Sequence, residues 1–406
     1  MTYFELKELG QNWKGKICFF GAGLIGRTWA YDLFQAMGIP IDFFCDNKKE
    51  ENIVIRDHVK TISLQTLYSF KSDVMVFCTM STSHQSAIRE QLEKAGLKNI
   101  IPVDSYFLQT FMQSLEELKD ETIKKQFKCI LDDAEYVSGQ FKYRVGYELD
   151  LKNPKTLNEK IQWLKLYDRK PEYTLLADKF AVRQYVKEKF GEEYLIPLLF
   201  KTTDSNDLTY SNMPDQPCIV KTNHGTGDYQ IIRDKNSINW EELRQKFKRN
   251  LAKNLYYATR EFQYKNISPL IIVEKLLVLP NGRIPNDYKL HFFNGRCEFI
   301  YCSIDREGEN YRKVYDINWN PLDFVWVANA KNLCSQKGAD IPQPKSFKKM
   351  LEIGKEVSRD IRYVRVDFYD VEGKLYCGEI TLHHGGGYDT FYPEKYDAYY
   401  GQKLSL

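Results

Sequence analysis

Two acidic residues in the C-terminal part of the sequence have the spacing of a metal site. The segment YVRVDFYDVEGKLYCGEITLHH predicts a β-hairpin that turns around Gly373. If Gly373 is the centre of a three-residue loop, Asp367 lies opposite Glu379 across the ladder. Carboxylates in such a pair lie about 5 Å apart and repel each other unless a cation compensates them. We expect a hard divalent cation, Mg²⁺, to bind both of them.

The same hairpin separates a polar face from an apolar face, because every second side chain of a strand points the same way. The polar face carries Arg365, Asp367, Glu379, Thr381 and His383. The apolar face, which we expect to pack on the core, carries Val364, Val366, Phe368, Ile380 and Leu382. Two alternatives remain open: the carboxylates point separately into water, or a two-residue turn shifts the register by one and separates them.

A second chemical signal is the lysine–glycine hairpin, CIVKTNHGTGDYQIIR. A β-strand ends at Lys221, a loop holds Gly225 and Gly227, and a second strand returns. An ammonium group beside such a loop can cover triphosphate oxygens together with backbone amides. This is not a Walker A loop, because no helix follows and the GK[ST] ending is missing. Taken alone, the motif favours a plain hairpin with a solvated lysine.

The third signal lies near the N-terminus, where GAGLIG follows a short apolar run and precedes a helical pattern. Gly21, Gly23 and Gly26 have the GxGxxG spacing that lets backbone amides approach a pyrophosphate. Asp46 ends the next predicted strand, where an acid that binds a ribose is expected. Two interpretations remain open: a nucleotide site, or a Rossmann-like domain that has kept its turn and lost or exchanged its ligand.

The length of 406 residues predicts two or three domains. Alternating strand and helix patterns predict an α/β Rossmann-like domain over residues 1–104, followed by a helical linker over 105–150. From residue 151 to 406 the patterns predict an α+β domain with antiparallel sheets. Its first helix is expected after Thr156, because Thr156 and Glu159 have the spacing of a capping box.

The composition excludes several classes of protein. A net charge of +3 is too small for nucleic-acid binding by bulk charge. The nine cysteines are scattered without a CxxC pair, which argues against a disulfide framework or a zinc ribbon and favours a reducing compartment. No apolar run approaches the roughly twenty residues of a transmembrane helix. We therefore expect a cytoplasmic protein without a transmembrane segment.

The motifs, taken in order, resemble those of the ATP-grasp superfamily. The closest resemblance is to the teichuronopeptide-biosynthesis (TupA-like) amidoligase family of bacterial polysaccharide clusters, over about residues 150–406. It rests on NPKTLNEKIQWLKLYD, ADKFAVRQYV, VKTNHGTG, VEKLL, DYKLHFFNG, YDINW, RVDFY and GEIT. The resemblance implies an ATP-grasp fold for the second domain, with ATP and Mg²⁺ as cofactors.

The resemblance also implies roles for individual residues. The ATP phosphates would be held by Lys221 and the loop residues His224, Gly225, Thr226 and Gly227, with further contacts from Lys179 and Lys289. The hinge that recognises adenine would include Glu274, Lys275 and Leu277. Asp367 and Glu379 would ligate Mg²⁺, and the catalytic candidates are Arg365, Lys289 and His383. Asp287 shares a predicted face with Lys289 and could also reach the nucleotide.

The sequence departs from the family pattern in two places. Thr381 stands where the superfamily often has asparagine, and LHHGGGYDTF replaces an aromatic and proline-containing stretch. The second departure leaves the roles of His383 and His384 open: they bind substrate, act as a base, or only make structural hydrogen bonds.

The predicted function is an ATP-dependent carboxylate–amine ligase that forms an amide through an acylphosphate. The family resemblance implies a uronic acid carboxylate, on a glycan or a sugar nucleotide, and an amino acid or amino alcohol as the amine, in bacterial surface polysaccharide biosynthesis. Two alternatives remain: a kinase of a sugar hydroxyl with the same ATP and Mg²⁺ machinery, and a non-catalytic nucleotide-binding scaffold of a glycan assembly complex. The sequence does not predict the oligomeric state.

Overall fold

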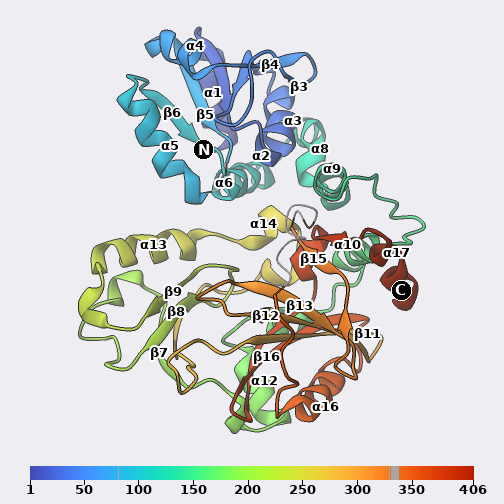
Figure 1. The fold of residues 1–406 in the computed structure, drawn as a ribbon. Helices are drawn as coiled ribbons and strands as arrows, with labels where there is room; N and C mark the ends of the chain where they lie inside the picture. The colour runs from blue at the N-terminus through green and yellow to red at the C-terminus, as the bar shows by residue number, and fades with distance from the viewer. Residues whose placement is uncertain (81, 329, 331–337) are drawn as a thin grey trace. The chain divides into compact units, whose positions relative to one another are not determined.

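The computed structural model of the chain describes residues 1–80, 82–328, 330 and 338–406. The chain divides into two compact units, Met1–Glu148 and Leu149–Leu406 (Figure 1). Within the described residues, none of the helices combines the length and the apolar character that a membrane crossing requires.

The N-terminal unit is built on a six-stranded sheet in the order β3-β4-β2-β1-β5-β6. Its strands are β1 (Lys16–Phe20), β2 (Phe43–Cys45), β3 (Val54–Arg56), β4 (Val59–Ile62), β5 (Val74–Cys78) and β6 (Asn99–Pro102). All neighbours pair in parallel except β3, which runs antiparallel to β4 at the edge. These parallel strands confirm the α/β class predicted for this part of the chain.

Helices cover both faces of this sheet, which explains why β1 and β5 are apolar almost throughout. On one face, Phe34 of α3 (Trp29–Ala36) packs edge-on against Phe19 and Phe77 at 4.9 and 4.6 Å between ring centroids. The other face packs against residues of α4 (Leu64–Ser69) and α5 (Thr82–Lys94). The remaining helices before residue 100 are α1 (Tyr3–Asn12) and α2 (Leu24–Arg27).

Residues 105–148 belong to the N-terminal unit, whereas we had expected a linker over 105–150. They form α6 (Ser105–Glu116), α7 (Glu121–Gln126), α8 (Lys128–Leu131) and α9 (Asp133–Val145). In α6, Phe107 and Phe111 are buried, and the Phe111 ring meets Tyr3 of α1 edge-on at 6.2 Å. The charged run that suggested a linker extends over α7, which has no buried residue, whereas α6 and α9 on either side of it bury apolar side chains.

The described residues of the C-terminal unit form three sheets, in which the neighbouring strands are antiparallel, as predicted. The four-stranded sheet has the order β7 (Leu198–Thr202), β10 (Ile271–Lys275), β8 (Cys218–Thr222), β9 (Tyr229–Ile232). The six-stranded sheet has the order β14 (Pro321–Leu322), β13 (Tyr311–Tyr315), β12 (Arg296–Ile304), β11 (Asp287–Phe293), β16 (Tyr363–Val371), β17 (Lys374–Thr381). The third sheet pairs β15 (Val325–Val327) with β18 (Thr390–Tyr392).

The helices of this unit pack around these sheets. They are α10 (Leu157–Tyr167), α11 (Glu172–Ala177), α12 (Val182–Lys189), α13 (Trp240–Ala252), α14 (Leu255–Thr259), α16 (Phe347–Val357) and α17 (Lys395–Lys403). The predicted capping box is present at α10, where Thr156 and Glu159 each accept a hydrogen bond from the other's backbone amide. Residues of α16 share one hydrophobic core with the apolar face of the β16–β17 hairpin.

The β16–β17 hairpin has the predicted pairing but not the predicted turn. The turn holds two residues, Glu372 and Gly373, both with left-handed backbone (φ 55° and 95°), so the three-residue loop was wrong. A bulge on β17 then changes the register between Asp367 and Phe368. This extra residue compensates for the shorter turn, and Asp367 still pairs with Glu379.

Candidate active site

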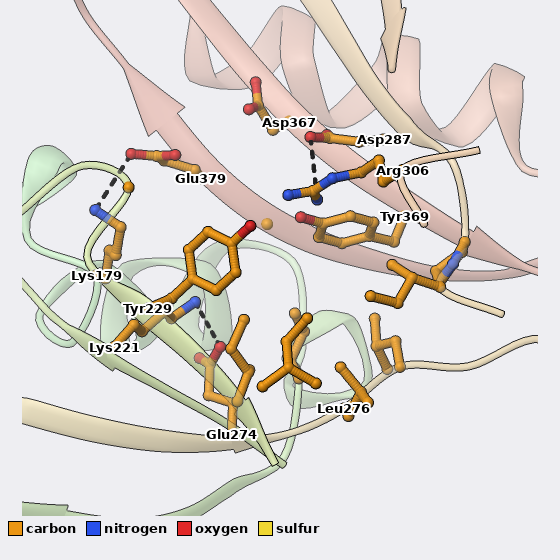
Figure 2. A pocket seen from close by; sticks show the side chains of 18 of the residues that line it. Lys179, Lys221, Tyr229, Glu274, Leu276, Asp287, Arg306, Asp367, Tyr369 and Glu379 are labelled. Atoms are coloured by element: carbon orange, nitrogen blue, oxygen red, sulfur yellow. Dashed lines mark ion pairs between the residues drawn. The ribbon is translucent and has the colours of Figure 1, made fainter. Parts of the chain in front are cut away.

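A cavity of about 510 Å³ lies between the four-stranded and six-stranded sheets of the C-terminal unit (Figure 2). Most of the site residues predicted for this unit line it, although they come from segments far apart in the sequence. They are Lys179, Lys221, Gly225, Thr226, Gly227, Glu274, Lys275, Leu277, Lys289, Arg365, Asp367 and Glu379.

The register of the six-stranded sheet aligns the charged residues of the cavity. Glu379 on β17 pairs with Asp367 on β16, and Asp367 pairs with Lys289 on β11. Because directly opposed residues of antiparallel strands point to the same face, the three side chains form one row across the sheet. The other face of the hairpin, with Val366 and Ile380, is buried in the core. The row must therefore face the cavity.

Asp367 is the most tightly held carboxylate of this row. Nε and Nη2 of Arg365 donate to its Oδ1 and Oδ2, each at 2.7 Å, and Nζ of Lys289 donates to Oδ2 at 2.8 Å. Burial alone would raise the pKa of Asp367, but the charges of Arg365 and Lys289 outweigh it and hold this pKa below its ordinary value. Asp367 is therefore an anion at neutral pH.

Glu379 connects the six-stranded sheet to the lysine–glycine hairpin. Its Oε1 lies 3.3 Å from Nζ of Lys179, and Lys179 also donates to the carbonyl of Gly225 at 2.7 Å. Burial would raise the pKa of Glu379, but the charges of Lys179 and Arg365 lower it overall. Both carboxylates are thus ionised, and the glycine loop lies beside them.

The opposite wall of the cavity carries a buried ion-pair network on the four-stranded sheet. Glu274 of β10 lies 2.6 Å from Nζ of Lys221 on β8 and accepts a hydrogen bond from Arg183 at 2.8 Å. Directly after Glu274, the backbone amides of Lys275 and Leu276 donate to the carbonyls of Pro197 and Pro217. The chain segment that follows β10 is thereby fixed along the edge of the cavity.

Sequence reasoning missed two basic residues of the cavity, Arg306 in the β12–β13 connection and Arg312 on β13. Arg306 and Arg312 line the cavity, and Arg306 lies 3.9 Å from Asp287, the residue we had paired with Lys289 (Figure 2). Strand pairing explains why Arg312 lies near Asp287: Ser303 of β12 pairs with Asp287 on one side and with Arg312 on the other. This neighbour relation appears only when the order of the strands is known.

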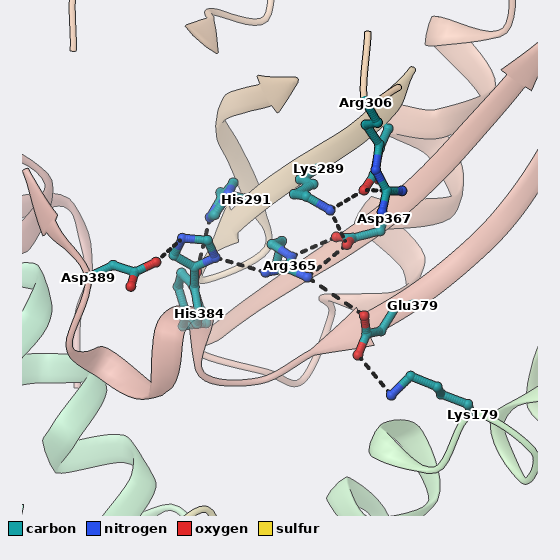
Figure 3. A network of polar contacts seen from close by, with 11 residues as sticks. Lys179, Lys289, His291, Arg306, Arg365, Asp367, Glu379, His384 and Asp389 are labelled. Atoms are coloured by element: carbon teal, nitrogen blue, oxygen red, sulfur yellow. Dashed lines mark hydrogen bonds and ion pairs between the residues drawn. The ribbon is translucent and has the colours of Figure 1, made fainter. Parts of the chain in front are cut away.

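Two predicted histidines are not among the residues that line the cavity. The ring of His224 is buried between Asn223 and the carbonyl of Lys253, at 3.0 Å from each. The ring of His383 lies 3.1 Å from Gln263, and burial lowers its pKa. The adjacent residue, His384, contacts Arg365 instead (Figure 3).

The glycine turn of the N-terminal unit packs closely against neighbouring backbone, and the predicted acid beside it bonds to backbone amides. Gly21 has left-handed backbone (φ 110°), and a Cβ at Gly26 would lie 2.5 Å from the Gly21 carbonyl, so both positions require glycine. Asp46 accepts hydrogen bonds from the amides of Ala22 at 2.9 Å and Lys48 at 2.8 Å. Both of its carboxylate oxygens thus bind backbone. A nucleotide contact by Gly21, Gly23, Gly26 and Asp46 remains a prediction.

The residues of the cavity fit a magnesium ion that binds together with phosphates. Within the described part of the chain, no three His, Cys, Asp or Glu side chains form a ready metal cage. Asp367 and Glu379 supply two hard oxygen ligands, and the buried Oδ1 of Asp287 has no hydrogen-bond partner. Mg²⁺ usually takes one or two carboxylates and completes its shell with water and phosphate. The carboxylates of this cavity therefore fit a magnesium ion that is also bound by phosphate and water.

Comparisons with known proteins identify the family of this unit. The model of the TupA-like ATP-grasp family matches residues 159–405, while no curated protein matches the sequence. Among solved structures, a D-alanine–D-alanine ligase from Helicobacter pylori is similar at 14% identity (97% of this chain, 100% of that chain, TM-score 0.33). The corresponding Bacillus anthracis ligase is 11% identical (91% and 87%, TM-score 0.30), and the ATP-grasp ligase PsnB is 10% identical (92% and 91%, TM-score 0.30).

The family assignment rests on the sequence match, which spans more than half of the chain and coincides with the segment whose motifs suggested it. The chain belongs to the TupA-like ATP-grasp family, and as a member of that family it is an ATP-grasp ligase.

Proposed function

We propose that the protein uses ATP and Mg²⁺ to join a carboxylate to an amine. The observation that carries this proposal is the row Glu379–Asp367–Lys289, which faces the lysine–glycine hairpin across one cavity. Anionic groups for a cation and cationic groups for phosphates are thus present at the same place. Phosphoryl transfer depends mainly on such positioning and charge compensation.

The cavity offers a separate place for each part of the nucleotide. Lys221, Lys179 and the amides of the glycine loop would meet the phosphates, and the segment from Glu274 to Leu277 would meet adenine. Because the amides of Lys275 and Leu276 already donate to proline carbonyls, we assign the hydrogen bond to adenine to the amide of Leu277. Mg²⁺ held by Asp367 and Glu379 would supply positive charge to the phosphate oxygens.

The reaction would proceed in two displacements. An oxygen of the substrate carboxylate attacks the γ-phosphorus, the bond to the bridging oxygen of ADP breaks, and an acylphosphate forms. The amine nitrogen then attacks the acyl carbon, phosphate leaves with the bonding electrons, and the amine loses one proton. Arg365 and Lys289 line the cavity next to the metal ligands and would compensate the charge of the transferring group.

Membership of the TupA-like family supports a uronic acid as the carboxylate and an amino acid or amino alcohol as the amine. We therefore place the reaction in bacterial surface polysaccharide biosynthesis, in the cytoplasm, on a glycan or a sugar nucleotide. The cationic side chains Arg306 and Arg312 in the cavity agree with an acidic substrate.

The test is ADP release by the full-length chain over a matrix of uronic acids and amines, with mass spectrometry of the products. We expect ADP and phosphate only when both substrates are present, and a product of the mass of the amide. A stable phosphoester that forms without amine would instead indicate a sugar kinase. Binding of Mg·ATP without turnover for every pair would indicate a nucleotide-binding scaffold.

A further inference from the structure

The guanidinium of Arg365 contacts Asp367, His384 and Glu379 (Figure 3). Asp367 accepts from Nε and Nη2, and Nη1 lies 2.8 Å from Nδ1 of His384. Because a guanidinium can only donate, Nδ1 of His384 must be the acceptor in this contact. The neutral imidazole then carries its single proton on Nε2, on the other side of the ring.

That other side of the ring faces a carboxylate. Oδ2 of Asp389 lies 3.3 Å from Nε2 of His384. The backbone of Asp389 is fixed in turn, because its carbonyl accepts from Nδ2 of Asn158 at 2.8 Å and from Nε1 of Trp326 at 3.1 Å. Among the described residues Nε2 has no hydrogen-bond partner, so Asp389 supports the His384 ring by close contact on the side that faces away from Arg365.

The glycines after His384 make this contact possible. Gly385 and Gly386 have left-handed backbone (φ 57° and 60°), which turns the chain so that Asp389 returns to the histidine. A Cβ at Gly385 would lie only 2.3 Å from Cγ of Asp389. The ring itself is buried and packs against Trp326, at 4.2 Å between centroids. The segment from His384 to Asp389 thus builds a specific support for one arginine.

We propose that His384 is a positioning residue that, with Asp389 behind it, sets the rotation of the Arg365 guanidinium. Three hydrogen bonds hold the guanidinium, and Nη2 also lies 3.9 Å from Oε2 of Glu379. Nη1 keeps a further proton for the transferring phosphoryl group in the cavity. This inference rests on the proposed function and adds to it a residue that does not touch the substrate.

The test compares substitutions that keep or remove the acceptor at the position of Nδ1. His384→Asn can place an amide oxygen there, whereas His384→Gln reaches past it and His384→Leu offers no acceptor. With Leu and Gln we expect kcat to fall about 10- to 100-fold while KM for ATP changes less than about threefold. With Asn we expect activity within about fivefold of the wild type.

A double variant shows whether His384 acts through Arg365. In the Arg365→Lys background, His384→Leu should lower kcat by less than about twofold further, because the group that it positions is already gone. Two losses that multiply, or an Asn variant as inactive as the Leu variant, would overturn the proposal. Thermal unfolding of each variant reports whether it is folded.

Crystal structures of the variants with Mg²⁺ and AMP-PNP provide a readout that does not need turnover. The guanidinium should turn in His384→Leu and keep its orientation in His384→Asn. An unchanged guanidinium in both would refute the positioning role, even in an active enzyme. A wild type that joins no acid to an amine would refute the proposed function instead, and this structural comparison would still test the inference.

Discussion

The two units each contain a glycine-rich turn that is typical of phosphate binding, but the charges around the two turns differ. Around Gly225 and Gly227, the side chains of Lys179, Lys221 and Glu379 line one cavity. Around Gly21, the nearest predicted acid, Asp46, already accepts two backbone hydrogen bonds from its own unit. A glycine pattern therefore indicates a backbone shape, whereas charges converging from separate strands indicate a ligand.

The strongest way to test this contrast is to remove the carboxylate at the centre of the C-terminal cavity. Asp367→Asn keeps the shape of the side chain but removes the charge that Arg365 and Lys289 surround. We expect the rate of ADP formation to fall about 10²- to 10³-fold. Steady-state kinetics at saturating ATP measures the loss. Turnover at wild-type rate in Asp367→Asn would rule out the metal site.

A smaller effect is expected when the ammonium of Lys221, on the opposite wall of the cavity, is removed. Lys221→Met removes the ammonium that lies against Glu274, while Arg183 still pairs with that carboxylate. A hydrogen bond to a charged group contributes about 1.5–3 kcal/mol, so the Kd for Mg·ATP should rise about 10- to 100-fold. Isothermal titration calorimetry measures it. Lys201→Met, on β7 outside the cavity, is the matched control, and equal Kd values for both variants would contradict the assignment.

The bulge that keeps the two carboxylates paired can be tested by adding one methyl group. A Cβ at Gly378 would lie 2.9 Å from the ring of Tyr369 and 3.2 Å from the carbonyl of Asp367. We expect Gly378→Ala to lower the free energy of unfolding by about 1–3 kcal/mol, measured by urea denaturation. A variant as stable as the wild type would show that the hairpin tolerates another register.

The smallest effect on turnover is expected in the N-terminal unit. Asp46→Ala removes the acceptor for the amides of Ala22 and Lys48. The loss of these hydrogen bonds should destabilise the protein by about 1–3 kcal/mol while ADP formation by the folded enzyme stays within about twofold. Thermal unfolding and kinetics of the same preparation separate the two effects. A large loss of turnover in a fully folded variant would assign the N-terminal turn a part in the reaction.

Much of the fold followed from local pattern. The strand–helix alternation of the first hundred residues predicted a sheet with parallel strands, and the runs from Cys218 onward predicted antiparallel sheets. The boundary between the units did not follow, because the charged run of α7 resembles a solvated linker although the helices on either side of it, α6 and α9, have buried residues. Whether such a helix packs depends on which apolar surface is nearby, and one sequence does not show that.

The candidate site likewise has features that local pattern predicted and features that it did not. Alternation with a period of two placed Arg365 and Asp367 on one face of β16, and the assumed turn placed Glu379 opposite Asp367. The turn length was predicted wrongly, and the pairing persisted because the bulge on β17 compensates for the shorter turn. His383 and His384 could not be told apart by pattern, since the left-handed backbone of the following glycines decides which ring meets Arg365.

The sequence by itself determined which side chains share a face and which motifs relate the chain to its family. Only the tertiary structure decided that Lys289 lies opposite Asp367, that Arg306 and Arg312 reach the same cavity, and that Asp46 is already bonded. The physical reason is the distance along the chain over which each interaction acts. The side-chain period of a strand is set by bonds within a few residues, whereas strand order and burial depend on segments tens of residues apart that meet only when the whole unit packs.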